Sequence, residues 1–90
     1  MAKREVPLVP PGEILKEDFM EPLGLSINAL ARSVRLTPTC ISEIIRNRRN
    51  ITPETAIKLG HFFKTTPQFW MNLQTNYDIA KAQEKFVEAG

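Results

Sequence analysis

The stretch Ile27–Asn47, INALARSVRLTPTCISEIIRN, decides the fold of this chain. It holds two apolar patterns at helical spacing, and the second of them begins at Pro38. Val34 is the last apolar residue on the inner face of the first pattern, and Ile41 and Ile44 lie on the inner face of the second. The sequence therefore predicts two short helices joined by a tight turn.

The residues between these helices suit a close crossing. Ala31 supplies the small side chain that such a crossing needs, and Val34, Ile41 and Ile44 are spaced to fill the angle between the helices. This is the pattern of a helix-turn-helix motif, whose second helix lies in the DNA major groove with its early residues against base edges. We expect 26–47 to read DNA. Four residues should point away from the isoleucine face and meet base edges: Pro38, Thr39, Cys40 and Glu43.

Helix boundaries can be read along the rest of the chain. An apolar-faced segment starts near Pro11, and Pro22 and Gly24 should end it before Ser26 caps the next helix. Three later helices should begin at threonine–proline pairs. The threonine hydroxyl accepts a hydrogen bond from a backbone N–H group that lacks a partner within the helix, and the first helical position does not need the backbone N–H that proline lacks. These pairs are Thr37-Pro38, Thr52-Pro53 and Thr66-Pro67.

These boundaries predict an all-α fold of five helices, since no segment alternates like a strand. The 90 residues are enough for one domain, 1–90, and 42% of them are hydrophobic, as in a globular protein. Within it we expect a flexible N-terminal arm over 1–10, the helix-turn-helix over 26–47 and a longer C-terminal helix over 66–86.

Composition also indicates the cellular compartment. No apolar run approaches the roughly 20 residues of a membrane span, and the opening MAKREVPLVPPG lacks the apolar core of a signal peptide. The single cysteine, Cys40, has no partner for an internal disulfide. We therefore expect a cytoplasmic protein that does not enter the membrane.

Charge is unevenly distributed in a chain whose formal net charge is only +2. Five acids and one base lie between Glu5 and Glu21, whereas five bases and one acid lie between Arg32 and Arg49. A local basic cluster suits a phosphate-binding face. A solvated, arginine-rich surface is the alternative, and charge alone does not decide between the two.

The helix-turn-helix segment resembles that of the phage-repressor-like (Xre-type) regulators. Three further stretches are similar to the HigA antitoxins, also called VapI or virulence-associated protein I: PPGEILKEDFMEPLGLS, NRRNITPETAIKL and TTPQFWMNLQTNYDIAKA. The resemblance covers residues 10–82. It implies a five-helix phage-repressor-like domain that belongs to a type II toxin–antitoxin pair. Such a protein neutralises a HigB/RelE-like toxin that cleaves mRNA, and it represses its own operon.

Two positions depart from the family pattern. Arg35 stands in the turn where the family usually has glycine, and Arg46-Asn47 replaces asparagine-glycine at the end of the second helix. Asparagine tolerates the left-handed conformation, so we expect Asn47 to end that helix. Two shapes remain open at Arg35: a left-handed turn at a small energetic cost, or another turn altogether.

The resemblance and the helix geometry together suggest roles at DNA. Glu43 would accept a hydrogen bond from a cytosine amine, and Thr39 and Cys40 would touch a thymine methyl group. Each role has an alternative. Glu43 could instead pair with Arg46 or Asn47 on its own helix, and Cys40 could be a half-buried residue that packs against the core. The arginines could form a solvated helix end. Seven residues are the candidates for phosphate contact: Ser26, Arg35, Thr37, Arg46, Asn47, Arg48 and Arg49.

Three partners are expected. The first is double-stranded DNA carrying a pseudo-palindromic operator, and the second is a second copy of the chain, because such regulators bind as dimers. The dimer candidates, which could alternatively complete the monomer core, are Phe69, Trp70, Leu73 and Tyr77. The third is the HigB-like toxin. The acidic N-terminal residues that could bind it, or merely aid solubility, are Glu13, Glu17, Asp18 and Glu21, with Glu5 nearby.

Other function classes find little support. The sequence holds no Ser/His/Asp set, no glycine-rich phosphate loop and no metal cluster, and His61 has no ligand companion. We therefore expect no enzyme, cofactor or metal. The alternative function is a stand-alone Xre-type repressor without a toxin. A pure protein-interaction module is disfavoured by the basic cluster.

Overall fold

The computed structural model describes residues 8–89, with side chains described as far as Phe86. Glu5 and most of the expected N-terminal arm lie outside the described residues. The described part is all-α and contains no strand, which confirms the predicted fold class. Its elements are α1 (Pro11–Ile14), the π-helix η1 (Leu15–Met20), α2 (Glu21–Leu23), α3 (Ile27–Val34), α4 (Pro38–Ile45), α5 (Pro53–Phe63) and α6 (Pro67–Ala89). The first three are continuous, so the described chain has five helical segments.

The helices begin where side chains can cap them. The Thr37 hydroxyl oxygen accepts a hydrogen bond from the N–H of Cys40, with a donor–acceptor distance of 3.0 Å. Ser26 caps α3 in the same way at 3.0 Å. The Thr52 and Thr66 hydroxyls cap α5 and α6 at 3.4 and 3.1 Å. All four predicted N-caps are therefore confirmed, and a proline opens each of α4, α5 and α6.

Left-handed residues end the helices. Arg35 has φ of 62°, so the open question about this turn is resolved in favour of the left-handed conformation. Asn47 also has φ of 62°, as predicted. Its N–H bonds to the Ile44 carbonyl at 3.0 Å, and the N–H of Arg48 bonds to the Glu43 carbonyl at 2.8 Å. This pair of bonds is a Schellman motif, which satisfies the last carbonyls of α4.

The core lies between the N-terminal helical segment, α3, α4, α5 and the first half of α6. Ala31, 1% exposed, sits between α3 and α4 as the motif predicts, and Val34, Ile41 and Ile44 are buried around it. The largest fully buried side chains are Trp70, Leu15, Leu30, Ile41, Ile44, Ile51 and Leu59. Burial of this apolar set is the main force that holds the short helices together.

An aromatic cluster joins α6 to the N-terminal segment. The ring of Phe19 lies 4.8 Å from Trp70 and 5.1 Å from Phe63 between centroids. Trp70 is fully buried, and its indole N–H donates to the Thr65 hydroxyl at 2.7 Å. The prediction that Trp70 is a dimer contact is therefore wrong: the residue completes the monomer core, which was the alternative interpretation.

A close approach fixes α1 against α4. Gly12 is buried, and a Cβ atom built on it would lie 1.9 Å from the carbonyl oxygen of Ile44. No L side chain fits there without a shift of one backbone. Gly12 therefore lets the N-terminal segment support α4 directly along its inner side.

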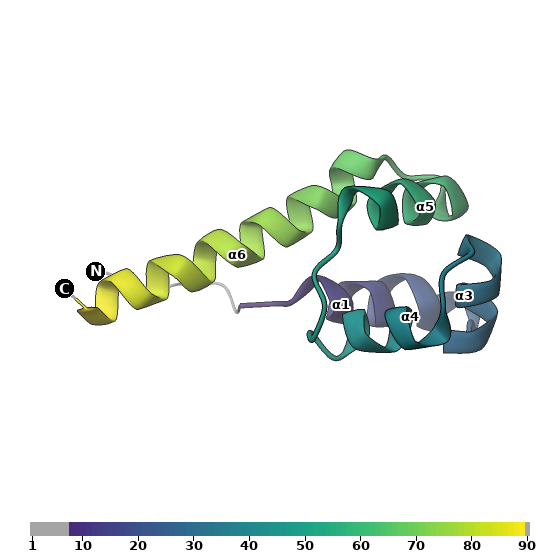
Figure 1. Ribbon diagram of the computed structural model, residues 1–90, viewed down its shortest axis with the longest axis horizontal. Helices are drawn as coiled ribbons and strands as arrows, with labels where there is room; N and C mark the ends of the chain where they lie inside the picture. The colour runs from purple at the N-terminus through teal and green to yellow at the C-terminus, as the bar shows by residue number, and fades with distance from the viewer. Residues whose placement is uncertain (1–7, 90) are drawn as a thin grey trace.

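Helix α6 extends beyond the body of the molecule (Figure 1). The structure measures 45 × 22 × 22 Å along its principal axes. The first half of α6 packs against α5 and α1, and the helix runs on to Ala89, where the sequence pattern predicted an end at 86. No helix in the described range is long and apolar enough to cross a membrane.

Candidate nucleic-acid interface

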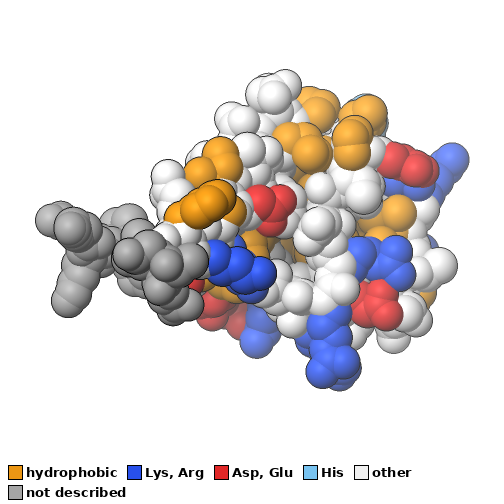
Figure 2. Space-filling model, turned by 60° about the vertical axis from the view of Figure 1, so that its left-hand side comes forward, with side chains coloured by type: hydrophobic (Ala, Val, Ile, Leu, Met, Phe, Trp, Pro, Cys, Tyr) orange, Lys and Arg blue, Asp and Glu red, His pale blue; other side chains and the backbone are white. Residues whose placement is uncertain are grey.

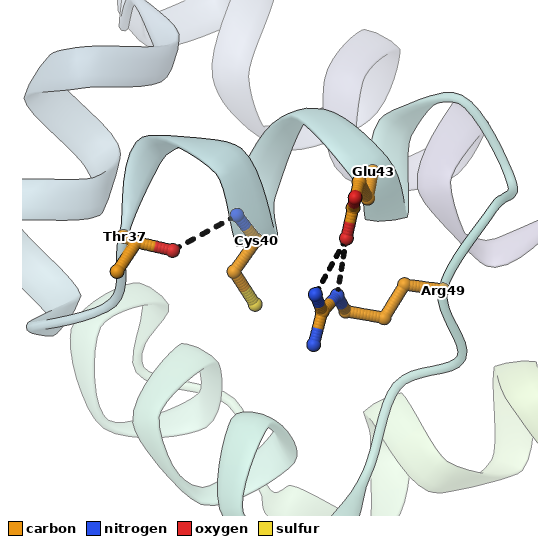
Figure 3. Close-up of polar contacts among 4 residues, drawn as sticks. All are labelled: Thr37, Cys40, Glu43 and Arg49. Carbon is orange, nitrogen blue, oxygen red and sulfur yellow. Dashed lines mark hydrogen bonds and ion pairs between the residues drawn. The ribbon is translucent and has the colours of Figure 1, made fainter.

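The outer side of α4 carries the predicted base-reading residues. Pro38 and Thr39 are exposed, whereas Cys40 and Glu43 are partly buried. Cys40 packs against the edge of the hydrophobic core, so its position agrees with the alternative of a half-buried small residue. Figure 3 shows Thr37, Cys40 and Glu43 along α4, with Arg49 reaching back from the following loop. The four base-edge candidates thus stay together on one short helix.

Glu43 and Arg49 form an ion pair at this surface. The guanidinium Nε and Nη2 atoms both donate to the carboxylate Oε1 of Glu43, at 2.8 and 2.5 Å. The side chains of Arg49 and Glu43 are 50% and 38% exposed. The hydrogen bond to Glu43, followed by its charge, raises the pKa of Arg49 above the ordinary value. The sequence alternative placed Glu43 with Arg46 or Asn47, and that alternative is wrong because the partner is Arg49.

The phosphate candidates lie at the two ends of α4. Arg35 and Thr37 precede the helix and are exposed, and Arg46, Arg48 and Arg49 follow it and are exposed as well. Eight residues of α-helix span roughly 12 Å, which is about the width of the major groove. Cationic groups at both ends of such a helix suit the phosphates on both sides of the groove. Ser26, the remaining candidate, is exposed at the start of α3.

The turn before α4 has a support of its own. The backbone carbonyl of Arg35 accepts a hydrogen bond from the Lys58 ammonium group at 3.1 Å, and Lys58 also pairs with Glu54 at 3.4 Å. This contact ties the turn to α5. The Arg35 side chain stays exposed, because the bond involves only its backbone.

Sequence reasoning missed a polar link between α6 and the loop after α4. Gln74 is 5% exposed, and its carbonyl oxygen accepts the Ile51 N–H at 2.7 Å. Its amide donates to the Asn50 and Asp78 side chains at 3.3 and 3.0 Å. The one sequence signal was a polar residue one turn after Trp70 on the inner face of the helix.

Tyr77 belongs to the same link. It was expected at a dimer interface, but its hydroxyl oxygen accepts a hydrogen bond from the Asn47 amide at 2.7 Å within the chain. Phe69 is 36% exposed and Leu73 is partly buried, so these two candidates keep an accessible surface. Figure 2 shows exposed hydrophobic side chains gathered mainly in the upper part of the molecule, where Figure 1 places α5 and the start of α6.

The acidic candidates lie on the N-terminal helical segment. Glu13, Glu17, Asp18 and Glu21 are all exposed, and Lys16 approaches Glu21 at 4.0 Å. A pocket of about 310 Å³ opens beside Glu21, with Met20, Leu25 and Ile27 among its lining residues. An acidic surface next to an apolar pocket is complementary in charge to a basic protein.

Metal chemistry finds no site in the part of the chain that the structure describes. No group of three or more His, Cys, Asp or Glu side chains is placed there to hold a metal ion. His61 is exposed on α5.

Comparison with known proteins places these features in a family. Residues 17–70 match the family described as Helix-turn-helix. The chain is 44% identical over 82 residues to virulence-associated protein I of Dichelobacter nodosus, covering 91% of this chain and 76% of that protein.

Two solved structures share the fold and were determined with DNA. The antitoxin HigA of Pseudomonas aeruginosa with the higBA promoter superposes with a TM-score of 0.87 at 37% identity, covering 92% of this chain and 90% of that one. The antitoxin GraA in complex with its operator superposes with a TM-score of 0.85 at 34% identity, covering 99% and 90% of the two chains.

Proposed function

The chain belongs to the helix-turn-helix family that includes virulence-associated protein I and the HigA antitoxins, and from this membership we propose that it is a DNA-binding antitoxin. It binds the operator of its own operon and neutralises a HigB/RelE-like toxin that cleaves mRNA. One observation carries the proposal: a recognition helix with Thr39 and Glu43 on its outer side and arginines at its ends, in the fold of two antitoxins solved with their promoter or operator. Both activities place the protein in the cytoplasm.

On the operator, α4 enters the major groove. Glu43 and Thr39 face base edges, with Pro38 and Cys40 beside them, and Arg46 and Arg48 hold phosphates at the end of the helix. Their exposed guanidinium groups have no ion-pair partner among the described residues. At the other end, three residues contact the DNA phosphates through their exposed side chains and nearby N–H groups: Ser26, Arg35 and Thr37.

The protein acts as a homodimer on a pseudo-palindromic site, which sets its two recognition helices roughly 34 Å apart. Phe69 and Leu73 remain the contacts proposed from the sequence. Ile79 and Phe86 extend the accessible apolar surface along α6, with exposed fractions of 50% and 78%. Exposed apolar side chains on a projecting helix are a suitable surface for a second copy.

The toxin contacts the exposed acidic residues of the N-terminal segment. A protein that binds and cleaves mRNA is typically basic, so charge complementarity favours this surface. The pocket beside Glu21 supplies apolar area that an electrostatic contact alone lacks.

The first test measures binding to the DNA upstream of the chain's own gene against a scrambled duplex across a salt series. We expect a preference of about a thousandfold or more. The triple variant Arg46→Ala, Arg48→Ala, Arg49→Ala should bind weakly and with a shallower salt slope. The variant Lys64→Gln, Lys81→Gln, Lys85→Gln removes the same charge elsewhere and should retain the slope. Equal, weak binding to both duplexes would contradict the repressor role.

The second test addresses the toxin. The variant Glu13→Lys, Glu17→Lys, Asp18→Lys should lose co-purification with the small protein encoded beside it, while its operator binding persists. Unchanged co-purification would show that the toxin contacts another surface. If no reading frame next to the gene encodes a RelE-like protein, the chain is the stand-alone repressor.

A further inference from the structure

We propose that Arg49 is a positioning residue that makes Glu43 a reader of cytosine. This inference rests on the proposed function and deepens it. Arg49 holds one carboxylate oxygen of Glu43 and leaves the other to accept a hydrogen bond from the N4 amine of one cytosine in each half-site. Arg49 was expected to bind a phosphate on the same footing as Arg46 and Arg48, and the structure separates it from them.

The arrangement of donors carries the first step. Two guanidinium nitrogens, Nε and Nη2, donate to the same atom, Oε1 of Glu43, at 2.8 and 2.5 Å. Within the described residues, Oε2 of Glu43 accepts no hydrogen bond. A carboxylate oxygen has lone pairs for a further donor, and the Glu43 side chain remains 38% exposed on the outer side of α4. The pair therefore presents a free acceptor at the surface.

Charge carries the second step. An unpaired carboxylate in the major groove is repelled by the phosphates on both sides. The Arg49 guanidinium neutralises Glu43, so that the acid can approach DNA without this penalty. The same pairing leaves Arg49 with little net charge to offer a phosphate. Arg46 and Arg48, which have no ion-pair partner in the described part of the chain, supply that charge instead.

Conformational order carries the third step. A free glutamate samples several rotamers, and fixing it on binding costs conformational entropy. Arg49 belongs to the loop after α4, and the neighbouring residues of that loop are held to α6 through Asn47–Tyr77 and Ile51–Gln74. The guanidinium is thus positioned by the fold, and the carboxylate is oriented before DNA arrives. A hydrogen bond to a base edge then discriminates the correct base by roughly 5- to 150-fold.

The test selects binding sites from duplexes with randomised positions and sequences the bound fraction. The wild-type protein should enrich a two-fold symmetric site with cytosine at one position of each half. Glu43→Gln should shift that position toward adenine, because a glutamine amide pairs with adenine N6 and N7. Arg49→Ala should flatten the preference at that position alone. Arg49→Lys should restore part of it, since lysine supplies the charge without the planar fork.

Arg46→Ala is the matched control, because it removes the same side chain three positions earlier. It should weaken all sequences alike and lower the salt slope on the selected site by about one phosphate contact. Arg49→Ala should instead alter the base preference, because it removes the group that orients Glu43, and the carboxylate that it leaves unpaired should also weaken binding to all sequences. Thermal unfolding monitors the fold of each variant, and all three side chains have exposed surface.

Each contrary outcome has a distinct meaning. If Arg49→Ala weakens every sequence alike and leaves the cytosine preference intact, as Arg46→Ala does, Arg49 is a phosphate ligand and the proposal is wrong. If Glu43→Gln leaves every base preference unchanged, Glu43 does not read cytosine and the proposal is also wrong. If the wild-type protein enriches no site at all, the proposed DNA-binding function fails together with it.

Discussion

The side chain of Asn47, at the end of α4, donates a hydrogen bond of 2.7 Å to the phenolic oxygen of Tyr77 on α6. Together with Gln74, which holds the Ile51 N–H, this bond fixes both ends of the loop 47–51 to a helix outside the helix-turn-helix. Arg48 and Arg49, which follow the recognition helix, are carried by this loop. The position of α6 therefore helps to set the geometry of the proposed DNA interface.

Removal of the Tyr77 hydroxyl should weaken this link. Tyr77→Phe keeps the ring, so we expect the free energy of unfolding to fall by about 0.5–1.5 kcal/mol and operator binding to fall a few-fold. Asn47→Gly removes the same bond from the other side and retains the left-handed conformation. A double-mutant cycle of chemical denaturation measures the coupling. Strictly additive effects would show that the bond contributes nothing.

Replacement of Arg35 separates backbone strain from charge. The left-handed conformation costs a non-glycine residue roughly 1–2 kcal/mol, which a glycine avoids. Glycine also loses more conformational entropy on folding, and this offsets the gain in stability by roughly 0.5–1 kcal/mol. Arg35→Gly should therefore raise the free energy of unfolding by roughly 0.5–1 kcal/mol. Arg35→Ala keeps the strain and should give no gain. If Arg35 contacts a phosphate, both variants lower the salt slope of operator binding equally.

Loss of the Thr37 cap should affect stability and DNA binding together. Thr37→Ala removes the acceptor for the Cys40 N–H and should cost about 0.5–2 kcal/mol, while Thr37→Ser should retain most of the stability. Thr66→Ala removes the equivalent cap from α6 and serves as the control. We expect similar losses of stability from both alanine variants but weakened operator binding from Thr37→Ala alone. Equal binding by the two would argue against a phosphate contact at Thr37.

A methyl group at Gly12 should disturb the support beneath α4. Gly12→Ala places a carbon against the carbonyl oxygen of Ile44, and we expect a loss of about 3 kcal/mol in unfolding free energy. Gly24→Ala is the comparison, because its Cβ meets nothing within 4 Å and pays only the left-handed strain of about 1 kcal/mol. Thermal unfolding of both variants tests the difference. A smaller loss at position 12 than at position 24 would contradict the close approach.

The features that the sequence predicted correctly depend on nearby residues. Ser26, Thr37, Thr52 and Thr66 cap helices through N–H groups three positions away, so the local pattern is sufficient. Asn47 adopts the left-handed conformation because its own side chain tolerates it. The face formed by Val34, Ile41 and Ile44 follows from helical periodicity for the same reason.

The features that the sequence did not predict depend on how distant segments meet. Trp70 is a core residue because Phe19 and Phe63, from two other helices, surround it. The bond between Asn47 and Tyr77 joins residues 30 positions apart. Glu43 pairs with Arg49 across six positions because the chain turns back after α4. Helical spacing predicts side-chain pairs only between residues three or four positions apart, so it did not indicate this pair.

The projection of α6 beyond the body implies a gradient of opening along one continuous helix. Trp70 and Gln74 are buried, whereas no described side chain after Gln74 is. Amide hydrogens near the aromatic cluster should exchange with solvent only when the whole domain unfolds, and those in the last turns through local fraying. A protease would therefore cut the far end of α6 first, while the helix-turn-helix stays folded. Binding that covers this end would appear as slower exchange there and as resistance to cleavage.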